Sequence, residues 1–236
     1  PKFRAGPRAG ALHNFAWRQH AAHGRGTCWS PMYRRSALAI ALLAAAFCAG
    51  CGDWSGFGFR AKGLELPRLR QALALKAGMV VADVGAGKGE LTFALAGEVG
   101  PGGYVFSTEI DPARLARLRE TVVRGKLGHV AVVEARIDDT GLTPDCCDAI
   151  VLRRVYHHLT DPARTNASLL QSLRPGGLLA VIDLPPPLSG HRGSLGISAQ
   201  VVVDEVTRSG FELLQLIDDW PGRGPFASYC AIFRKP

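Results

Sequence analysis

The stretch that decides the fold is VVADVGAGKGELT, residues 80–92. Its first half is an apolar run typical of a buried strand, and its second half is a glycine-rich turn that leads into a helix. Glycine at 85, 87 and 89 permits positive φ and leaves no side chain between a ligand and the backbone. Amides at the start of the helix would face the turn and favour polar or negative ligand groups. The stretch therefore predicts a nucleotide-type pocket.

The spacing of the glycines and of the acid that follows them indicates which kind of nucleotide the pocket would bind. A dinucleotide fingerprint requires Gly-x-Gly-x-x-Gly, and here the third glycine, Gly89, comes one position early. The next strand ends in Glu109, 20 positions after Gly89, a suitable distance for a carboxylate that binds ribose hydroxyls. Asp83 lies at the end of an otherwise apolar strand. Because burying this carboxylate alone would be costly, we expect a cationic or amide partner for it.

Further motifs follow this stretch in a fixed order. They are Glu109-Ile110-Asp111-Pro112, Asp138-Asp139-Thr140-Gly141-Leu142, Asp148-Ala149-Ile150-Val151-Leu152, Tyr156-His157-His158 and Leu173-Arg174-Pro175-Gly176-Gly177. Together with DVGAGKG at 83–89, the set resembles the class I S-adenosylmethionine-dependent methyltransferases, and it runs from about Leu64 to Pro236. The resemblance implies an α/β fold: a doubly wound, Rossmann-like sheet of seven strands, mostly parallel, with an antiparallel last strand.

The apolar pattern predicts the same architecture. Strands are expected at 79–84, 104–108, 129–133, 149–152, 178–182, 211–217 and 227–233, and helices at 67–74, 88–98, from 112 onward, at 163–173 and at 199–208. Strands that alternate with helices and are apolar almost throughout predict a parallel sheet covered on both faces. Asp111 is the expected N-cap of the helix that begins at Pro112. Arg174–Gly177 should form the turn before the fifth strand.

The resemblance also implies roles for individual residues. Gly85, Gly87 and Gly89 would shape the turn under the methionine and ribose parts of S-adenosylmethionine, Asp83 would hold its amino-acid end, and Glu109 would accept hydrogen bonds from both ribose hydroxyls. Either Asp138 or Asp139 would accept from the adenine amino group, and the sequence leaves this choice open. An ordinary tight turn is the alternative for the glycines.

Catalytic residues are harder to identify, because methyl transfer from a sulfonium mainly requires that the reactants be held in line. A base is required only if the nucleophile arrives protonated. His157 and His158 follow the fourth strand, at the edge that opens on the cleft in doubly wound sheets, and either could be that base. Packing is the alternative for this pair. Arg153 and Arg154 could bind an anionic acceptor or simply be solvated.

Asp183-Leu184-Pro185-Pro186-Pro187 partly resembles the Asp-Pro-Pro-Tyr motif of enzymes that methylate amino groups of nucleic acid bases. It follows the fifth expected strand rather than the fourth and lacks the aromatic residue, which counts against such an enzyme. We expect a rigid loop over the cleft, with His191 and Arg192 as possible lid or acceptor contacts.

The net charge of +8 is concentrated at one end of the chain. Residues 1–62 contain nine Lys and Arg and one acid, whereas residues 63–236 contain nineteen of each. The neutral second part gives no argument for a nucleic acid partner. We expect one methyltransferase domain at 63–236, preceded by a disordered extension and a leader.

The leader is predicted from residues 32–51. A short basic segment that ends at Arg35 precedes an uncharged apolar stretch, Ser36 to Gly50, which is too short to span a bilayer comfortably. Small residues before Cys51 resemble a bacterial lipoprotein box, which makes Cys51 a lipidation candidate. The cell envelope is therefore the expected location of the protein. A helix that rests on the domain or on a membrane surface, an organellar transit peptide and a cytoplasmic location are alternatives.

The remaining cysteines give no disulfide framework. Cys146, Cys147 and Cys230 are odd in number, and no metal site is expected. Neighbouring cysteines in an extended chain point to opposite faces, so Cys146 and Cys147 are expected to be structural thiols that cannot share a metal.

Two functions are compatible with these residues. The first is a methyltransferase that acts on a small-molecule or lipid acceptor with S-adenosylmethionine as cofactor, with no nucleic acid partner and contact with a membrane only through the leader. The second is a membrane-tethered protein that binds S-adenosylmethionine or a nucleoside without turnover, since an exported domain would be separated from cytoplasmic S-adenosylmethionine. A nicotinamide-dependent oxidoreductase is disfavoured by the glycine spacing.

Overall fold

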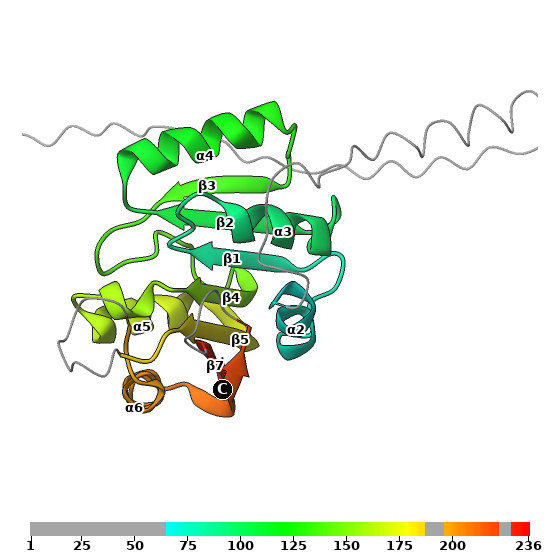
Figure 1. Cartoon of the computed structure of the whole chain (residues 1–236). Coiled ribbons are helices and arrows are strands. Elements are labelled where there is room, and N and C mark those ends of the chain that lie inside the picture. Colours follow the sequence, from blue (N-terminus) through cyan, green and yellow to red (C-terminus); the bar gives the residue numbers. More distant parts are fainter. Residues whose placement is uncertain (1–64, 187–195, 222–227) are drawn as a thin grey trace, which may run out of the picture. The chain divides into compact units, whose positions relative to one another are not determined.

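The computed structural model describes residues 65–186, 196–221 and 228–236, which form an α/β sheet with helices on both faces (Figure 1). The strands are β1 (Val80–Val84), β2 (Tyr104–Glu109), β3 (Val130–Glu134), β4 (Cys147–Arg153), β5 (Leu173–Asp183), β6 (Glu212–Trp220) and β7 (Ser228–Arg234). The helices are α2 (Glu65–Ala72), α3 (Glu90–Val99), α4 (Pro112–Arg124), the short η3 (Tyr156–His158), α5 (Pro162–Ser172) and α6 (Ala199–Arg208).

The strand order is β3-β2-β1-β4-β5-β7-β6. Neighbouring strands from β3 to β5 pair in parallel, whereas β7 pairs antiparallel with both β5 and β6. The predicted seven-stranded sheet and its antiparallel last strand are therefore confirmed. Because the chain leaves β1 toward β2 on one side and β4 lies on the other, the strand order reverses at β1. In doubly wound sheets a ligand crevice lies at the carboxyl ends of strands at such a reversal.

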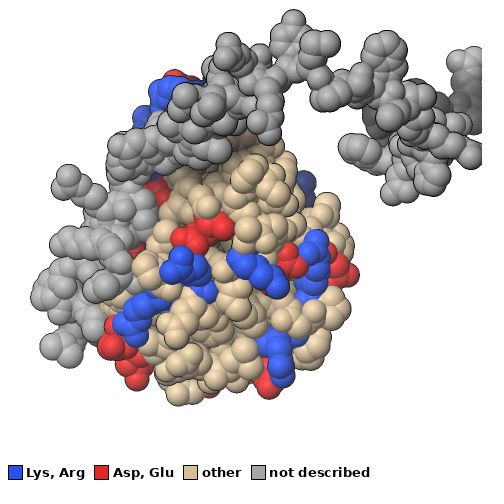
Figure 2. Space-filling view, turned by 90° about the vertical axis from the view of Figure 1, so that its right-hand side faces the viewer, with Lys and Arg blue, Asp and Glu red and all other residues tan. Residues whose placement is uncertain are grey.

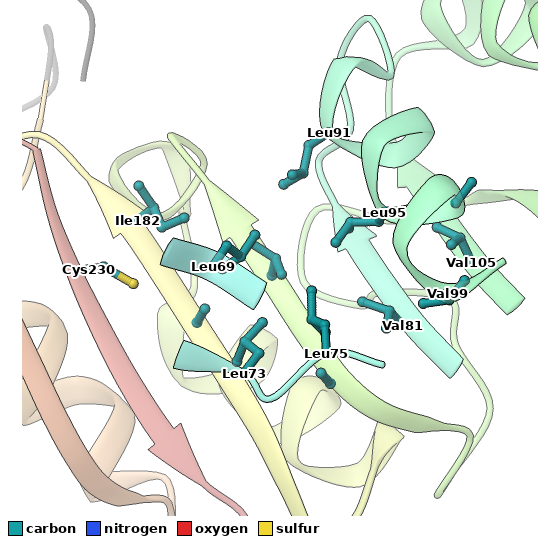
Figure 3. Packing of buried hydrophobic residues seen from close by; sticks show 14 of the residues in the cluster. Leu69, Leu73, Leu75, Val81, Leu91, Leu95, Val99, Val105, Ile182 and Cys230 are labelled. Atoms are coloured by element: carbon teal, nitrogen blue, oxygen red, sulfur yellow. The ribbon is translucent and has the colours of Figure 1, made fainter. Parts of the chain in front are cut away.

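Alternating strand residues bury opposite faces of the sheet. Val81 of β1 packs in a cluster under α2 and α3, and the next residue, Ala82, packs in a second cluster with α5 and α6. Figure 3 shows the first cluster: Leu69 lies over the sheet from α2, and Leu95 and Val99 lie over it from α3. Leu69, Leu95 and Val99 are fully buried. This packing fixes α3, which begins directly after the glycine turn.

The connection between β3 and β4 is a loop, in keeping with the predicted helices, none of which falls between these strands. No helix lies between these strands in the described part of the chain, and residues 135–146 instead form a loop tied to α5. The Thr140 amide donates to Ser168 Oγ at 3.1 Å, and Ser168 Oγ donates to Asp139 Oδ1 at 3.1 Å. Side-chain hydrogen bonds to α5 thus fix the loop, and the loop brings the expected adenine-binding segment to the cleft.

The fifth strand is longer than predicted, because Arg174–Gly177 belongs to β5 rather than to a turn before it. Leu173 pairs with Cys147, and Gly176 and Gly177 exchange backbone hydrogen bonds of 2.9 Å with Lys235 near the chain end. Long-range pairing has overridden the local turn signal of Pro-Gly-Gly.

The two adjacent cysteines are closer than predicted. Cys146 precedes β4 rather than continuing it, and its Sγ lies 3.1 Å from Cys147 Sγ, so the expectation that the two side chains point apart was wrong. Burial raises the pKa of the Cys147 thiol far above its usual range, which favours the protonated, structural form. Among the described residues, no group of three or more potential metal-ligating side chains occurs.

Charges are interleaved on the surface that Figure 2 shows, where basic and acidic side chains lie next to one another. Exposed ion pairs of the described chain, such as Arg234 with Glu212 at 2.6 Å, fit this distribution. None of the described helices is long and apolar enough to cross a membrane. The predicted leader at 32–51, Cys51 included, and the loop residues His191 and Arg192 lie outside the described residues.

Candidate active site

The glycine turn has the backbone that its sequence predicts. Gly85, Gly87 and Gly89 all have positive φ, at 72°, 60° and 81°. A Cβ on Gly85 would lie 2.5 Å from Val155 Cγ2, and a Cβ on Gly89 would lie 2.6 Å from Leu118 Cδ2. Nothing lies within 4 Å of a Cβ built on Gly87. Gly85 and Gly89 are therefore required for close packing as well as for conformation, whereas Gly87 is required for conformation alone.

Glu109 ends β2 and turns toward the glycine turn. Its Oε2 accepts from the Gly87 amide at 2.9 Å, and its Oε1 accepts from the amides of Ile110 at 2.9 Å and Asp111 at 3.1 Å. Arg114 lies 3.7 Å from Oε2. A carboxylate oxygen has more than one acceptor site, so Oε2 can still accept from a ligand hydroxyl. The backbone amides fix the carboxylate where the sequence predicted a ribose-binding group.

Asp83, at the end of β1, is 2% exposed. Its Oδ2 accepts from the Thr92 hydroxyl at 2.6 Å, and Thr92 Oγ1 lies 2.9 Å from Ser107 Oγ. Burial raises the pKa of Asp83 to about 6, and the Thr92 hydrogen bond and the positive charge of Arg153 oppose this shift. The Thr92 hydroxyl is thus a partner that the sequence did not predict, beside the backbone hydrogen bond of Thr92 and the positive charge of Arg153. The site holds a carboxylate that a cationic ligand group would stabilise.

A cavity of about 640 Å³ lies beside these residues, a volume typical of small-molecule sites. Its lining comes from the carboxyl ends of β1 to β4 and the segments after them, and it includes Asp83, Gly85, Gly87 and Glu109. Gly89 lies behind the turn, packed against α4, and does not line the cavity. The crevice predicted at the strand reversal is therefore present.

The two candidate adenine-binding acids have different surroundings. Asp139 lines the cavity, and its Oδ1 accepts from the Gly141 amide at 3.0 Å. This hydrogen bond is the main cause of a lowered Asp139 pKa. Asp138 is absent from the lining and forms an ion pair of 2.9 Å with Arg164. The geometry favours Asp139 as the acid that faces a ligand.

The cavity lining includes two apolar residues that were not predicted from the sequence. Ile110 and Ile137 both line it, although they are 55% and 64% exposed. Large exposed apolar side chains beside a cavity offer surface to a flat apolar group such as an adenine ring. Their positions, directly after Glu109 and directly before Asp138, are the signal that could have revealed them.

The histidine pair is divided by the fold. His157 is nearly buried, and its Nδ1 lies 2.8 Å from Oδ1 of the fully buried Asp183. His158 lines the cavity, and the two imidazole rings lie 3.9 Å apart between centroids. Partial burial and the neighbouring His157 lower the pKa of His158, which keeps its imidazole neutral at physiological pH. Only His158 is placed to meet a ligand, and His157 with Asp183 supports it.

Residues 153–160, which we call the β4 wall, close the cavity opposite the Glu109 side. Arg153 Nε donates to Glu65 Oε1 at 2.9 Å, and Glu65 also accepts from Trp220 Nε1 at 3.4 Å. Arg154 lines the cavity with a left-handed backbone, φ 59°. The two arginines that looked equivalent in the sequence both line the cavity but differ in their contacts. Arg153 ties α2 to the sheet through Glu65, whereas the Arg154 guanidinium has no ion pair within the described part of the chain.

Comparison with known proteins agrees with this geometry. The methyltransferase domain family matches residues 82–181, which contain the glycine turn, Glu109 and the β4 wall. The chain thus contains a methyltransferase domain. A ubiquinone/menaquinone biosynthesis C-methyltransferase (UbiE) of Marinomonas sp. is 30% identical over 116 residues, which cover 49% of this chain and 46% of that protein. The chain thus matches about half the length of such curated relatives.

Solved structures confirm the fold. A methyltransferase from Aquifex aeolicus that depends on S-adenosylmethionine superposes with a TM-score of 0.63 at 22% identity, covering 73% of this chain and 90% of that one. The [4+2]-cyclase SpnF superposes equally well, with a TM-score of 0.63 at 16% identity, 72% of this chain and 79% of that one. Since a cyclase shares the class I fold, the fold by itself does not determine the reaction of the methyltransferase domain.

The residues of the cavity fit S-adenosylmethionine, the cofactor of this family. Asp83 offers a carboxylate for the ammonium group, Glu109 for the ribose, and Ile110 and Ile137 offer apolar surface for adenine. The Thr108 hydroxyl is buried, lines the same cavity and has no hydrogen-bond partner among the described residues. A buried hydroxyl without a partner is costly, so a polar ligand atom there would be favoured.

Proposed function

We propose that the protein transfers the methyl group of S-adenosylmethionine to carbon of a quinone-type small molecule. The observation that carries the transfer is Glu109, held by three backbone amides beside a glycine turn that opens on the cavity. The carbon acceptor is supported by the similarity to the Marinomonas C-methyltransferase. The proposal includes quinone rings that carry a lipid chain, because it specifies only the ring of the acceptor.

The residues of the chain perform binding, orientation and proton transfer in this mechanism. S-adenosylmethionine supplies a methyl group already activated by the sulfonium charge. Glu109 and the glycine turn fix the donor, which makes proximity and alignment the main source of rate enhancement. An acceptor between the donor and the β4 wall would lie beside His158. The neutral imidazole can take a proton from a ring hydroxyl and so make the ring carbon more nucleophilic.

The test is turnover with a simple quinol. Purified protein is incubated with S-adenosylmethionine and a naphthoquinol, and methylated product is measured by mass spectrometry. Product with a new carbon-bound methyl group supports the proposal, whereas binding of S-adenosylmethionine without product from a panel of quinols would contradict the acceptor class. Product with methyl on oxygen would keep the transfer but overturn the carbon acceptor.

The role of His158 has its own test. His158→Gln should lower kcat about 10²-fold or more if the imidazole is the base. Because the pKa of His158 is lowered, activity of the unmodified protein should persist when the pH falls somewhat below the usual histidine value and then decline. His157→Gln is the comparison, since it removes the Asp183 partner without removing the group that lines the cavity. Equal activity of the His158 variant would exclude the base.

We propose in addition that residues 32–51 direct the protein to the cell envelope. The support is the order of basic segment, apolar stretch and Cys51 in the sequence. Mass spectrometry of the mature N-terminus tests this directly: a lipidated Cys51 supports it, and an intact leader on the protein from the cytoplasmic fraction contradicts it.

A further inference from the structure

Arg154 is the half-buried cation of the cavity lining that has no acidic partner among the described residues. Five basic side chains and four acidic ones line the cavity. Arg153 pairs with Glu65 at 2.9 Å, Arg114 lies 3.7 Å from Glu109, and the charge of Arg136 lowers the pKa of Asp139. The structure gives Arg154 no hydrogen bond or ion pair of its guanidinium within the described residues.

The backbone of Arg154 is held in place despite an unfavourable conformation. Its φ of 59° lies in the left-handed region, which residues other than glycine and asparagine rarely adopt. The Arg154 amide donates to the Ile182 carbonyl of β5 at 2.7 Å, which anchors the residue at the end of the sheet. Backbone strain that the surrounding structure maintains is often found where a side chain must face a ligand.

The neighbour of Arg154 in the sequence packs against the glycine turn. Val155 is the side chain that a Cβ on Gly85 would strike at 2.5 Å, so the β4 wall packs directly on the glycine turn. Arg154 is half-buried, whereas Lys88, a further cation of the lining, is exposed on the turn. An anionic ligand group would stabilise a half-buried cation that has no acidic partner, because the anion compensates for the hydration that burial removes.

We infer that Arg154 binds an anionic group of the methyl acceptor and selects ring acceptors that carry an acidic substituent next to the reacting position. This inference rests on the proposed function. A sulfonium donor adds one more positive charge to the cleft, and an anionic acceptor neutralises it. During transfer the methyl–sulfur bond breaks as the methyl–carbon bond forms, the sulfonium becomes a neutral thioether, and the displaced ring proton leaves to solvent, while the substituent on Arg154 keeps its negative charge. That charge offsets the sulfonium in the partly dry cleft, which favours an anionic ring acceptor over a neutral one. The guanidinium can hold a carboxylate or phenolate through two parallel hydrogen bonds.

The test compares two probes that differ in charge. The protein, saturated with S-adenosylhomocysteine, is titrated calorimetrically with 1-hydroxy-2-naphthoate and with its uncharged analogue 1-hydroxy-2-naphthamide. The anion should bind about tenfold more tightly or better, as expected for a charge-assisted contact. In Arg154→Asn, whose new side chain tolerates a left-handed backbone, the preference should fall to about one. Arg154→Lys should keep part of it.

The control is Arg119→Gln, which removes an exposed arginine of α4 outside the cavity and should keep the full preference. Affinity for S-adenosylmethionine should be unchanged in every variant. Equal binding of the two probes by the unmodified protein, no binding of either, or an undiminished preference in Arg154→Asn would overturn the inference while the proposed function stands. Failure to bind S-adenosylmethionine would overturn the proposed function itself, and this inference with it.

Discussion

The two sides of the cleft are built in different ways. On the β1 and β2 side, backbone amides and glycines set the geometry: Glu109 is held by three main-chain N–H groups, and the turn keeps positive φ at three positions. On the β4 side, the geometry depends on side chains far apart in sequence, such as His157 with Asp183 and Arg153 with Glu65. Under the proposed function, the first side holds the donor and the second side contacts the acceptor.

The largest effect should come from adding a single carbon where the two sides touch. Gly85→Ala places a Cβ against Val155 and forces a side chain into the left-handed region, so we expect a loss of about 2–4 kcal/mol in the free energy of unfolding. Binding of S-adenosylmethionine should be lost as well. Chemical denaturation and calorimetric titration measure the two effects.

Gly97→Ala is the matched control for that substitution. Gly97 is exposed in α3 and has no heavy atom within 4 Å of its built Cβ, so alanine should stabilise the protein by about 0.5–1 kcal/mol. If Gly85→Ala were as harmless as Gly97→Ala, the close contact between the glycine turn and the β4 wall would be wrong.

Asp83 should make stability depend on pH in a direction unusual for a carboxylate. Its pKa is raised by burial from 3.8 to about 6, so the folded state binds the proton more tightly than the unfolded chain does. Its contribution to the free energy of unfolding should therefore fall by about 3 kcal/mol as the pH rises from about 4 to 6, and stay level above that.

The measurement for Asp83 is denaturation of the unmodified protein and of Asp83→Asn across this range. The difference between the two proteins should grow in favour of the variant as the pH rises, because asparagine has no charge to bury. The variant should bind S-adenosylmethionine less tightly than the unmodified protein, since it has lost the carboxylate for the ammonium group. A difference in stability that does not vary with pH would show that Asp83 has no raised pKa.

Glu109→Gln probes the side of the cleft that depends on the backbone. Both carboxylate oxygens of Glu109 accept from backbone amides, whereas glutamine has only one acceptor oxygen. Its NH₂ group would therefore face at least one backbone N–H, and that donor would lose its hydrogen bond. We expect affinity for S-adenosylmethionine to fall by about 1–3 kcal/mol in calorimetric titration. Glu134→Gln is the control, because Glu134 lies opposite Glu109 in the sheet register but is exposed. Equal affinities in the two variants would remove Glu109 from the ribose site.

The contrast between the two sides also explains what the sequence could reveal. The glycine turn, Glu109 and the N-cap Asp111 are local patterns, and the structure bears out their conformations, including the hydrogen bond of 2.8 Å from the Arg114 amide to Asp111. The start of β5 was predicted wrongly, because it depends on contacts between distant segments. Buried Asp183 looked like part of a loop motif, although in the fold it is the partner of His157.

Asp138 and Asp139 should give the smallest effects and still answer a question that the sequence left open. Asp138→Asn removes a partly exposed ion pair with Arg164 and should change the free energy of unfolding by less than about 1 kcal/mol, without changing affinity for S-adenosylmethionine. Asp139→Asn alters an acceptor that lines the cavity and should weaken that affinity by about 1 kcal/mol. Titration of the two variants with S-adenosylmethionine and with its analogue lacking the adenine amino group separates the roles. The penalty of Asp139→Asn should disappear with the analogue if Asp139 receives that amino group, and an equal penalty with both ligands would assign Asp139 to the loop alone, through Gly141 and Ser168.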